Sequence, residues 1–236
     1  MTRACTSSLR SFLLLAAASG LTGCTAHQET PTARAALVNA HYSALYQAEP
    51  DERCPLHATD ISAVDEQYLR REVAYDIREQ PGTIMDTADR HLYLVRENGR
   101  AIRYGIGVGA DGMKWSGRAV VGRKAAWPRW TPTASMIKRD PERNAPWAKG
   151  MTPGLANPLG PCALYLYQNG RDTLYRIHGT NEPHTIGEAV SSGHPHAQSD
   201  ILDLYRRTPT GAAVVVLADA PRPTLEARSA PVSPAM

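Results

Sequence analysis

Two stretches with β-strand signals, each divided by an Asn-Gly pair, constrain the fold more than any other feature of the sequence. The first, HLYLVRENGRAIRYGIGVG, predicts strands at 92–96 and 101–108. The second, ALYLYQNGRDTLYRIHG, predicts strands at 163–168 and 173–178. Asn-Gly tolerates the positive φ angles that a tight two-residue hairpin turn requires. The sequence therefore predicts a mainly β protein organised around two hairpins.

A helix and one further strand are expected after the second hairpin. Ser199 is an N-cap candidate for a helix that runs through DILDLYRR. Three apolar residues of this helix would share one face: Ile201, Leu204 and Tyr205. The run AAVVVL at 212–217 predicts a buried closing strand. Segment 127–160 is rich in Pro, Gly and Trp, which predicts a long irregular insertion.

The N-terminus is typical of a targeting segment. Arg3 and Arg10 precede an apolar run at 12–18 that is too short to remain as a membrane-spanning helix. The run ends in LTGC, which resembles the lipobox of bacterial lipoproteins, so Cys24 would carry the lipid after cleavage of residues 1–23. Several acyl chains anchor a protein firmly. Thr25 resembles the sorting signal for the outer membrane; the alternative is an ordinary secretory signal with a chance Cys.

The rest of the N-terminal region, the C-terminal tail and the net charge say less about fold and function. We expect a tether with short helices over 24–79, at 33–47 and near 64–71, and a disordered tail over 219–236. The formal net charge is +3 without a clustered basic stripe, so nucleic acid is not an expected partner. In an oxidising compartment Cys54 and Cys162 are permitted to form a disulfide, which the sequence leaves open.

Six stretches together resemble the catalytic domain of the L,D-transpeptidases. They are TADRHLYLV, GRAVVGRKAAWPRWTP, NPLGPCALYLY, YRIHGTNEP, TIGEAVSSG and VVVL. The resemblance covers residues 80–218 and implies a small mixed β-sandwich with short helices and no cofactor. It also implies a Cys thiolate that attacks the stem peptide of peptidoglycan, releases D-Ala and forms an acyl-enzyme, which an amine then resolves.

The resemblance also implies roles for individual residues. His178 matches the base, because a neighbouring imidazole lowers the pKa of a Cys nucleophile; without this motif context, a structural His would be the simpler interpretation. Gly179, Ser192 and Gly193 match positions that stabilise the oxyanion or bind substrate. Arg129, Trp130 and Pro132 resemble the approach to the cleft, but we expect them to pack the insertion.

The motif departs from the family at the nucleophile. The family pattern reads Ser-Gly-Cys-Ile-Arg, whereas this chain reads Ser192-Gly193-His194-Pro195-His196. His194 therefore stands at the position of the missing nucleophilic Cys, and His196 stands at the Arg position that would contact substrate. His184 also replaces a Trp that is frequent in close relatives. From these changes we expect little or no transpeptidase activity.

A frameshift in the gene would account for the altered motif. If the codons of His194 to Gln198 are CAT-CCG-CAT-GCT-CAA, restoring the bases TG in front gives Cys-Ile-Arg-Met-Leu and the start of Asn or Lys. One further lost base would restore the frame and leave the chain one residue short. The frameshift is then either present in the gene, or it is a sequencing error and the gene encodes an active enzyme.

Three alternatives to a frameshift stay open. The chain is a selected pseudoenzyme, a peptidoglycan-binding lipoprotein without turnover. Alternatively, a zinc site for hydrolysis forms from the histidines His178, His184, His194 and His196. Finally, Cys162 is a relocated nucleophile, which requires a three-residue bulged turn, because a two- or four-residue turn points it to the opposite face from His178. In all cases we expect a periplasmic, membrane-anchored protein.

Overall fold

A computed structural model describes residues 40–50, 56–75, 79–80, 82–86, 89–109, 116–190 and 194–217. The signal segment, Cys24, Cys54 and the C-terminal tail lie outside these residues, so the predictions made for them stay predictions. In the described ranges no helix is long and apolar enough to cross a bilayer.

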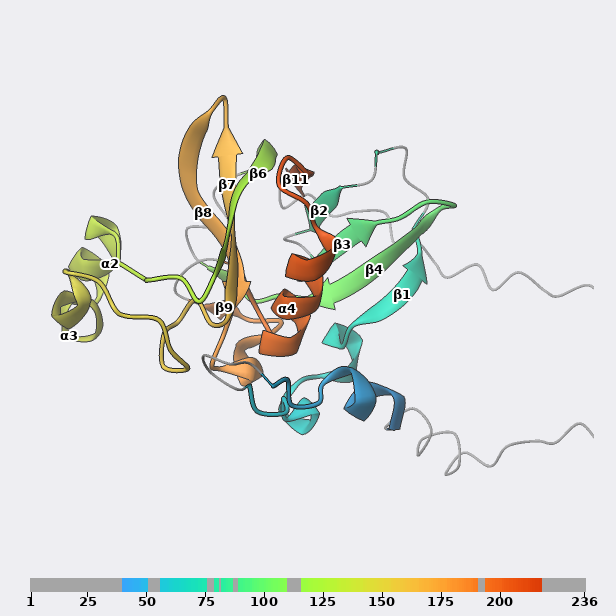
Figure 1. Ribbon diagram of the computed structural model, residues 1–236, viewed down its shortest axis with the longest axis horizontal. Helices are drawn as coiled ribbons and strands as arrows, with labels where there is room; N and C mark the ends of the chain where they lie inside the picture. The colour runs from blue at the N-terminus through green and yellow to red at the C-terminus, as the bar shows by residue number, and fades with distance from the viewer. Residues whose placement is uncertain are drawn as a thin grey trace, which may run out of the picture.

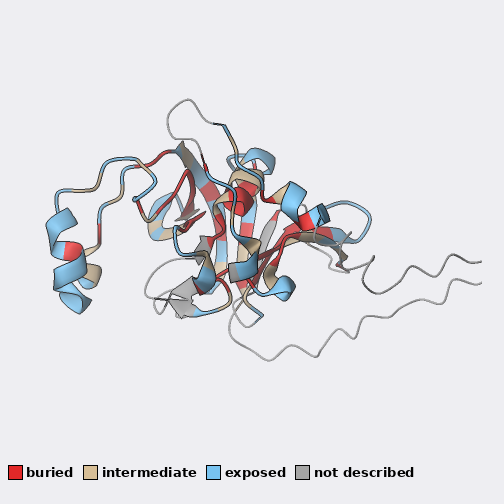
Figure 2. Ribbon diagram, turned by 90° about the horizontal axis from the view of Figure 1, so that it is seen from below, coloured by how far each residue is buried: buried red, intermediate tan, exposed pale blue. Residues whose placement is uncertain are grey.

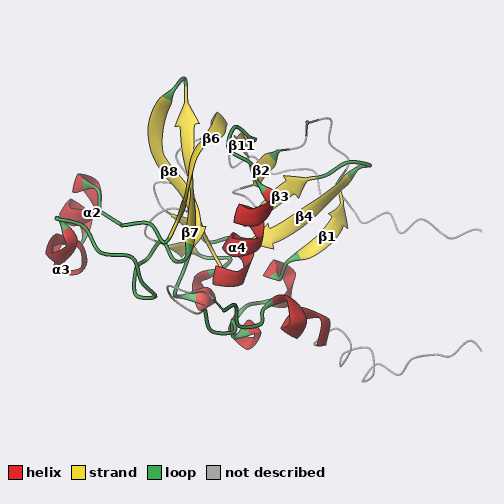
Figure 3. Cartoon of the chain, in the orientation of Figure 1, coloured by secondary structure: helices red, strands yellow, loops and turns green. Residues whose placement is uncertain are grey.

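Eleven strands dominate the described chain (Figures 1 and 3). The strands are β1 Arg71–Ala74, β2 Thr83–Asp86, β3 His91–Val95, β4 Arg100–Gly105, β5 Val108–Gly109, β6 Gly117–Ala126, β7 Cys162–Gln168, β8 Arg171–Gly179, β9 Ala189–Val190, β10 His194–His196 and β11 Ala213–Leu217. The helices are α2 Ala134–Arg139, α3 Pro141–Asn144 and α4 Gln198–Arg207, with 3₁₀ turns at Ile61–Ala63, Glu66–Tyr68, Ala145–Trp147 and Pro183–Thr185. The prediction of a mainly β fold with short helices is confirmed.

Nine strands form one mixed sheet in the order β1-β4-β3-β2-β11-β6-β7-β8-β10. Two pairs of neighbouring strands are parallel, β11 with β2 and β10 with β8, and the other pairs in this sheet are antiparallel. The two halves of the sheet run in different directions, and α4 is drawn between them in Figure 1. The main core joins these parts, because it contains Leu92 of β3, Leu166 of β7, Val214 of β11 and Leu204 of α4.

Both hairpins turn where the Asn-Gly pairs predict. Asn98 and Gly99 have φ angles of 59° and 64°, and Asn169 and Gly170 have 51° and 75°. Positive φ at both central residues defines the turn that matches strand twist. The first hairpin is shorter than predicted, since β4 ends at Gly105 and residues 108–109 pair with β9 instead.

The predicted face of α4 is confirmed, but its predicted cap is wrong. Ile201 and Leu204 are fully buried, and Tyr205 packs against the same core. The N-cap is Ala197, whose side chain makes no capping bond. Ser199 lies inside the first turn, where its hydroxyl lies 3.1 Å from the Thr59 hydroxyl. A tertiary contact therefore takes the oxygen that local sequence assigned to the helix end.

The N-terminal segment is part of the folded body. Residues 40–45 are helical, within the predicted 33–47. The prediction of a helix near 64–71 is wrong, because this segment forms a 3₁₀ turn at Glu66–Tyr68 and then strand β1. Tyr42 and Tyr46 pack with Leu69 and with Ile186 in a second buried cluster.

The insertion is more ordered than the sequence predicts. Thr133 caps α2, and Asp140 caps α3, through hydrogen bonds from backbone N–H groups to their side chains. Both helices lie to one side of the sheet and are mostly exposed (Figure 2). Arg129 donates to the carbonyls of Lys149 and Gly150, so it holds the two ends of the insertion together, as expected for a packing residue.

Candidate active site

His178 lies at the end of β8, between two neighbouring strands. Its register partners are Ala163 on β7 and Pro195 on β10. The residue is only 8% exposed. Its Nδ1 lies 2.6 Å from the carbonyl oxygen of Gly179. Since a carbonyl only accepts, this contact requires the hydrogen to be on Nδ1.

The surroundings of His178 favour its neutral form. Burial lowers its pKa below the ordinary value, and the positive charge of Arg176 adds to this effect. The carbonyls of Gly179 and Pro158 act in the opposite direction, but burial outweighs them. A neutral imidazole can accept a proton, so the protonation state suits a base.

A loop over residues 157–161 supports the chain beside His178. The Asn157 side chain is 1% exposed and donates to the carbonyls of Pro128 and Thr152 at 3.0 and 3.1 Å. Its Oδ1 accepts from the Leu159 N–H at 2.9 Å. Three bonds from one amide fix the loop to the base of the insertion. The sequence analysis did not single out Asn157, because its partners are backbone groups that the fold brings together.

Gly179 fits a place where a side chain would collide. A Cβ there would lie 3.2 Å from both Ile201 and Pro161. The Gly179 N–H donates to the Leu159 carbonyl at 3.0 Å. Its observed contribution is thus close packing of loop, strand and helix, while its predicted role toward an oxyanion stays a prediction.

The altered motif falls partly outside the described residues. Ser192 and Gly193 lie outside them, and so does the side chain of His194. The backbone of His194 opens β10 and is paired with Ile177, a fully buried core residue of β8. The predicted nucleophile position is therefore on the strand next to His178, one residue out of register with it.

His196 is fully enclosed. It is 0% exposed, and its ring lies edge-on to Tyr104 with a centroid distance of 6.4 Å. Its carbonyl accepts from the Thr180 N–H at 2.8 Å. The contact with substrate predicted for this position stays a prediction.

The other candidate groups do not gather at His178. His184 is exposed. Among the described residues no group of three His, Cys, Asp or Glu side chains could hold a metal ion. Cys162 is 2% exposed in the main core. It directly precedes Ala163, the partner of His178, and successive strand residues point to opposite faces. The geometry thus places Cys162 on the face away from the imidazole.

A largely buried charge cluster ties α4 to the N-terminal segment. Arg70 Nη1 lies 3.0 Å from Asp203, and its Nε lies 3.6 Å from Asp200. The Tyr46 hydroxyl donates to Asp200 at 3.0 Å and accepts from the Arg70 N–H at 2.7 Å. Burial raises the pKa of Asp200 to about 7, although Arg70 and Tyr46 act to lower it.

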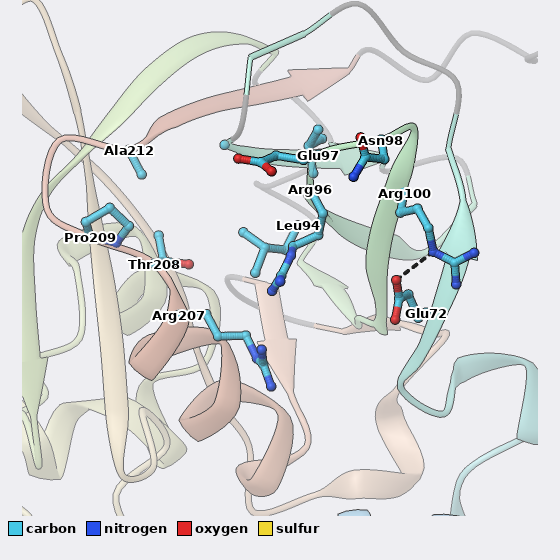
Figure 4. Close-up of a pocket in the computed structure, with 12 residues that line it drawn as sticks. Glu72, Leu94, Arg96, Glu97, Asn98, Arg100, Arg207, Thr208, Pro209 and Ala212 are labelled. Atoms are coloured by element: carbon cyan, nitrogen blue, oxygen red, sulfur yellow. Dashed lines mark hydrogen bonds and ion pairs between the residues drawn. The ribbon is translucent and has the colours of Figure 1, made fainter.

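Two pockets differ in their relation to His178. One of about 280 Å³ is lined by residues of the insertion and by the loop beside His178, among them Trp130, Arg139, Trp147, Pro158 and Asn181. A larger one of about 620 Å³ lies between the β3–β4 hairpin and the end of α4 (Figure 4). There Arg100 donates to Glu72 at 2.6 Å. Neither pocket is lined by His178 itself, but the smaller one includes Pro158, whose carbonyl acts on the His178 ring, so the smaller pocket is the candidate approach for a substrate.

The family model and the curated relatives name the same family. Residues 82–216 match the family model described as the L,D-transpeptidase catalytic domain, YkuD. The probable L,D-transpeptidase YbiS of Escherichia coli strain K12 is 34% identical over 151 residues, which cover 61% of this chain and 47% of that protein. A putative L,D-transpeptidase of Fuscovulum blasticum is 31% identical over 147 residues, covering 61% of this chain and 72% of the relative. The chain thus spans about half the length of the Escherichia coli relative.

One solved structure has higher sequence identity. A Brucella melitensis protein, described as a probable carnitine operon oxidoreductase, is 40% identical and covers 67% of this chain and 99% of its own. Its TM-score is 0.47.

Proposed function

The chain belongs to the L,D-transpeptidase catalytic domain family, and on that premise we propose that it acts on the stem peptides of peptidoglycan with little or no turnover. The observation that carries the proposal is the combination of a buried, neutral His178 with a His at the neighbouring nucleophile position. In this proposal His178 serves as the base, and the Cys that it would activate is replaced by His194.

The chemistry explains why the change matters. In the complete reaction the thiolate forms a bond to the peptide carbonyl carbon, the bond to D-Ala breaks, and D-Ala leaves as the free amine after protonation. Cys is intrinsically far more nucleophilic near neutral pH than other side chains. An imidazole at position 194 would form a reactive acyl-imidazole, and Pro195 and His196 also replace residues of the motif. We therefore expect D-Ala release to be lost while the peptide site is retained.

A non-catalytic peptidoglycan-binding lipoprotein is the second candidate. It is favoured by the intact core and loop around His178, which a decaying gene has no reason to retain. In both cases we propose that Cys24 carries the lipid and holds the protein at a periplasmic membrane surface, most simply the outer membrane. No nucleic acid, metal or other cofactor takes part.

The test is an assay of D-Ala release from a disaccharide-tetrapeptide, with metal-free protein. We expect no release, together with measurable binding to isolated sacculi. Release by the unaltered chain would overturn the claim of impaired turnover. Absence of both release and binding would overturn the substrate class. Hydrolysis that disappears with a chelator would instead support the zinc alternative.

A further inference from the structure

We propose that Arg123 binds the terminal carboxylate of the stem peptide, on the same face of the sheet as His178. This inference rests on the proposed function, because it names the group of the stem that the site recognises. The inference is carried by a row of three side chains, one on each of the strands β6, β7 and β8. These three strands lie side by side in Figure 1.

The row is fixed by strand register. Arg123 is paired with Tyr165, and Tyr165 is paired with Arg176. Directly paired residues of antiparallel strands share a face. A shift in register between Val121 and Arg123 brings Arg123 opposite Tyr165. Such a bulge re-aims a side chain and is over-represented next to active sites.

Both guanidinium groups stack on the same ring. The Cζ of Arg123 lies 3.7 Å from the centroid of Tyr165, and that of Arg176 lies 4.2 Å away. The ring is only 6% exposed as a result. Stacking holds a guanidinium in one plane, so less freedom is lost when its N–H fork meets a carboxylate.

The two arginines differ in what else they contact. Arg176 makes two hydrogen bonds to the carboxylate of Asp172, at 2.7 and 2.8 Å. Arg123 is exposed, and its charge also acts on Asp172 and lowers the pKa of that carboxyl, but the two hydrogen bonds of Asp172 to a guanidinium go to Arg176. The row thus carries two positive charges and one negative charge. Arg123 has the charge and the donors left to hold an anion.

The row lies close to the base. Arg176 and His178 are two residues apart on β8, so they share a face at a spacing of about 7 Å. In the stem peptide the terminal carboxylate belongs to the D-Ala that leaves, one residue beyond the carbonyl that is attacked. Arg123 itself is two strands away from β8, but its guanidinium lies over the ring of Tyr165, a diagonal neighbour of His178 at a Cα spacing of about 7–8 Å. The geometry therefore favours the terminal carboxylate over anionic groups further along the stem.

The experiment measures binding of two tetrapeptide stems to the full chain, one with a free C-terminal carboxylate and one with a C-terminal amide. Because the chain is expected to bind without turnover, equilibrium binding is accessible by calorimetry. We expect the acid to bind about tenfold more tightly than the amide. In Arg123→Gln this preference should fall to about onefold, through weaker binding of the acid alone.

Two further variants sharpen the result. Arg171→Gln removes an exposed Arg of the same strand as Arg176, paired with Gln168 at the hairpin tip, and should keep the full preference. Arg123→Lys keeps the charge but loses the planar fork, and should keep part of the preference. A merely structural role of Arg123 would weaken the acid and the amide alike, and that outcome would overturn the assignment.

The remaining outcomes separate this inference from the proposed function. Equal binding of acid and amide to the unaltered chain contradicts the role of Arg123 but leaves the stem as the ligand. Failure of both peptides to bind contradicts the proposed function itself, and the role of Arg123 with it.

Discussion

Pro195, rather than His194, lies opposite His178 in the parallel pairing of β10 with β8. Proline has no N–H to donate to a strand ladder and locks its own φ angle. The altered segment therefore differs from the family motif in its backbone as well as in its nucleophile.

Restoring the Cys alone should thus be insufficient. We expect His194→Cys to release little D-Ala from a tetrapeptide stem. Replacing His194 to Gln198 by Cys-Ile-Arg-Met-Leu-Asn should give release that is at least about a hundredfold faster, the scale on which loss of an essential group acts. The same replacement with Ser in place of Cys is the control. Equal rates for the single change and the full replacement would contradict the importance of the backbone.

The gene should record how the motif changed. If a frameshift produced it, the codons for His194 to Gln198 read CAT-CCG-CAT-GCT-CAA, and sequencing of the source DNA checks this directly. A TGC codon after Gly193 would mean that the amino-acid sequence is in error at this point. Any other codon for His194 or His196 removes the frameshift hypothesis.

His178 should titrate below the ordinary histidine value of about 6.5. Burial lowers its pKa in the folded protein, so the unfolded chain binds this proton more readily. Its contribution to stability is therefore complete above pH 6.5 and is lost as the pH falls through the lowered pKa. A titration of the ring C–H signals by NMR measures the shift. In His178→Gln, the loss of stability between pH 7 and pH 5 should be smaller.

Arg70 should matter more to stability than its exposed counterparts. Its side chain is 10% exposed and lies between two carboxylates of α4, one of them fully enclosed. Arg70→Met removes a buried ion-pair partner of Asp203. Because Arg207 remains paired with Asp203 and Asp200 can stay protonated, the change should cost about 1.5–3 kcal/mol in free energy of unfolding. Arg100→Met removes a pair whose partners are both half exposed and should cost less than about 1 kcal/mol. Urea denaturation of the two variants compares them; similar losses would contradict the interpretation.

Asp200 should lower the stability of the folded protein as the pH rises toward about 7. Its pKa is raised to about 7 by burial, so the folded state holds a proton that the unfolded chain releases near pH 4. This contribution to stability is fully present below pH 4 and is lost as the pH rises through about 7. Thermal melts of the unaltered chain and of Asp200→Asn at pH 5 and pH 8 test the sign. The difference in Tm between the two pH values should shrink in the variant.

The elements that the sequence predicted well are those with local causes. The hairpins follow from Asn-Gly pairs that accept positive φ, and the buried face of α4 follows from the spacing of Ile201 and Leu204. His178 was found because its neighbours along the chain form a motif. None of these conclusions required knowledge of a distant partner.

The elements that it missed depend on distant partners. Ser199 was expected to cap α4, but its hydroxyl meets Thr59, 140 residues away. β1 is a strand because it pairs with β4 at the edge of the sheet, and its own pattern is weak. Asn157 acts through carbonyls that only the folded insertion brings to it. A single sequence does not show such pairings before the topology is known.

The bond between Tyr46 and Asp200 has a consequence for the order of events during folding. It joins residues 154 positions apart, and Arg70 finds its carboxylate partners on the same late helix. During synthesis the N-terminal segment emerges early, yet Tyr46 and Arg70 can form these contacts only after almost the whole chain, including α4, has been made. Contacts of this separation slow folding and prolong the exposure of unpaired strands. For a chain that we propose to be exported, such a delay is an advantage, because a segment that cannot close early stays competent for threading across a membrane.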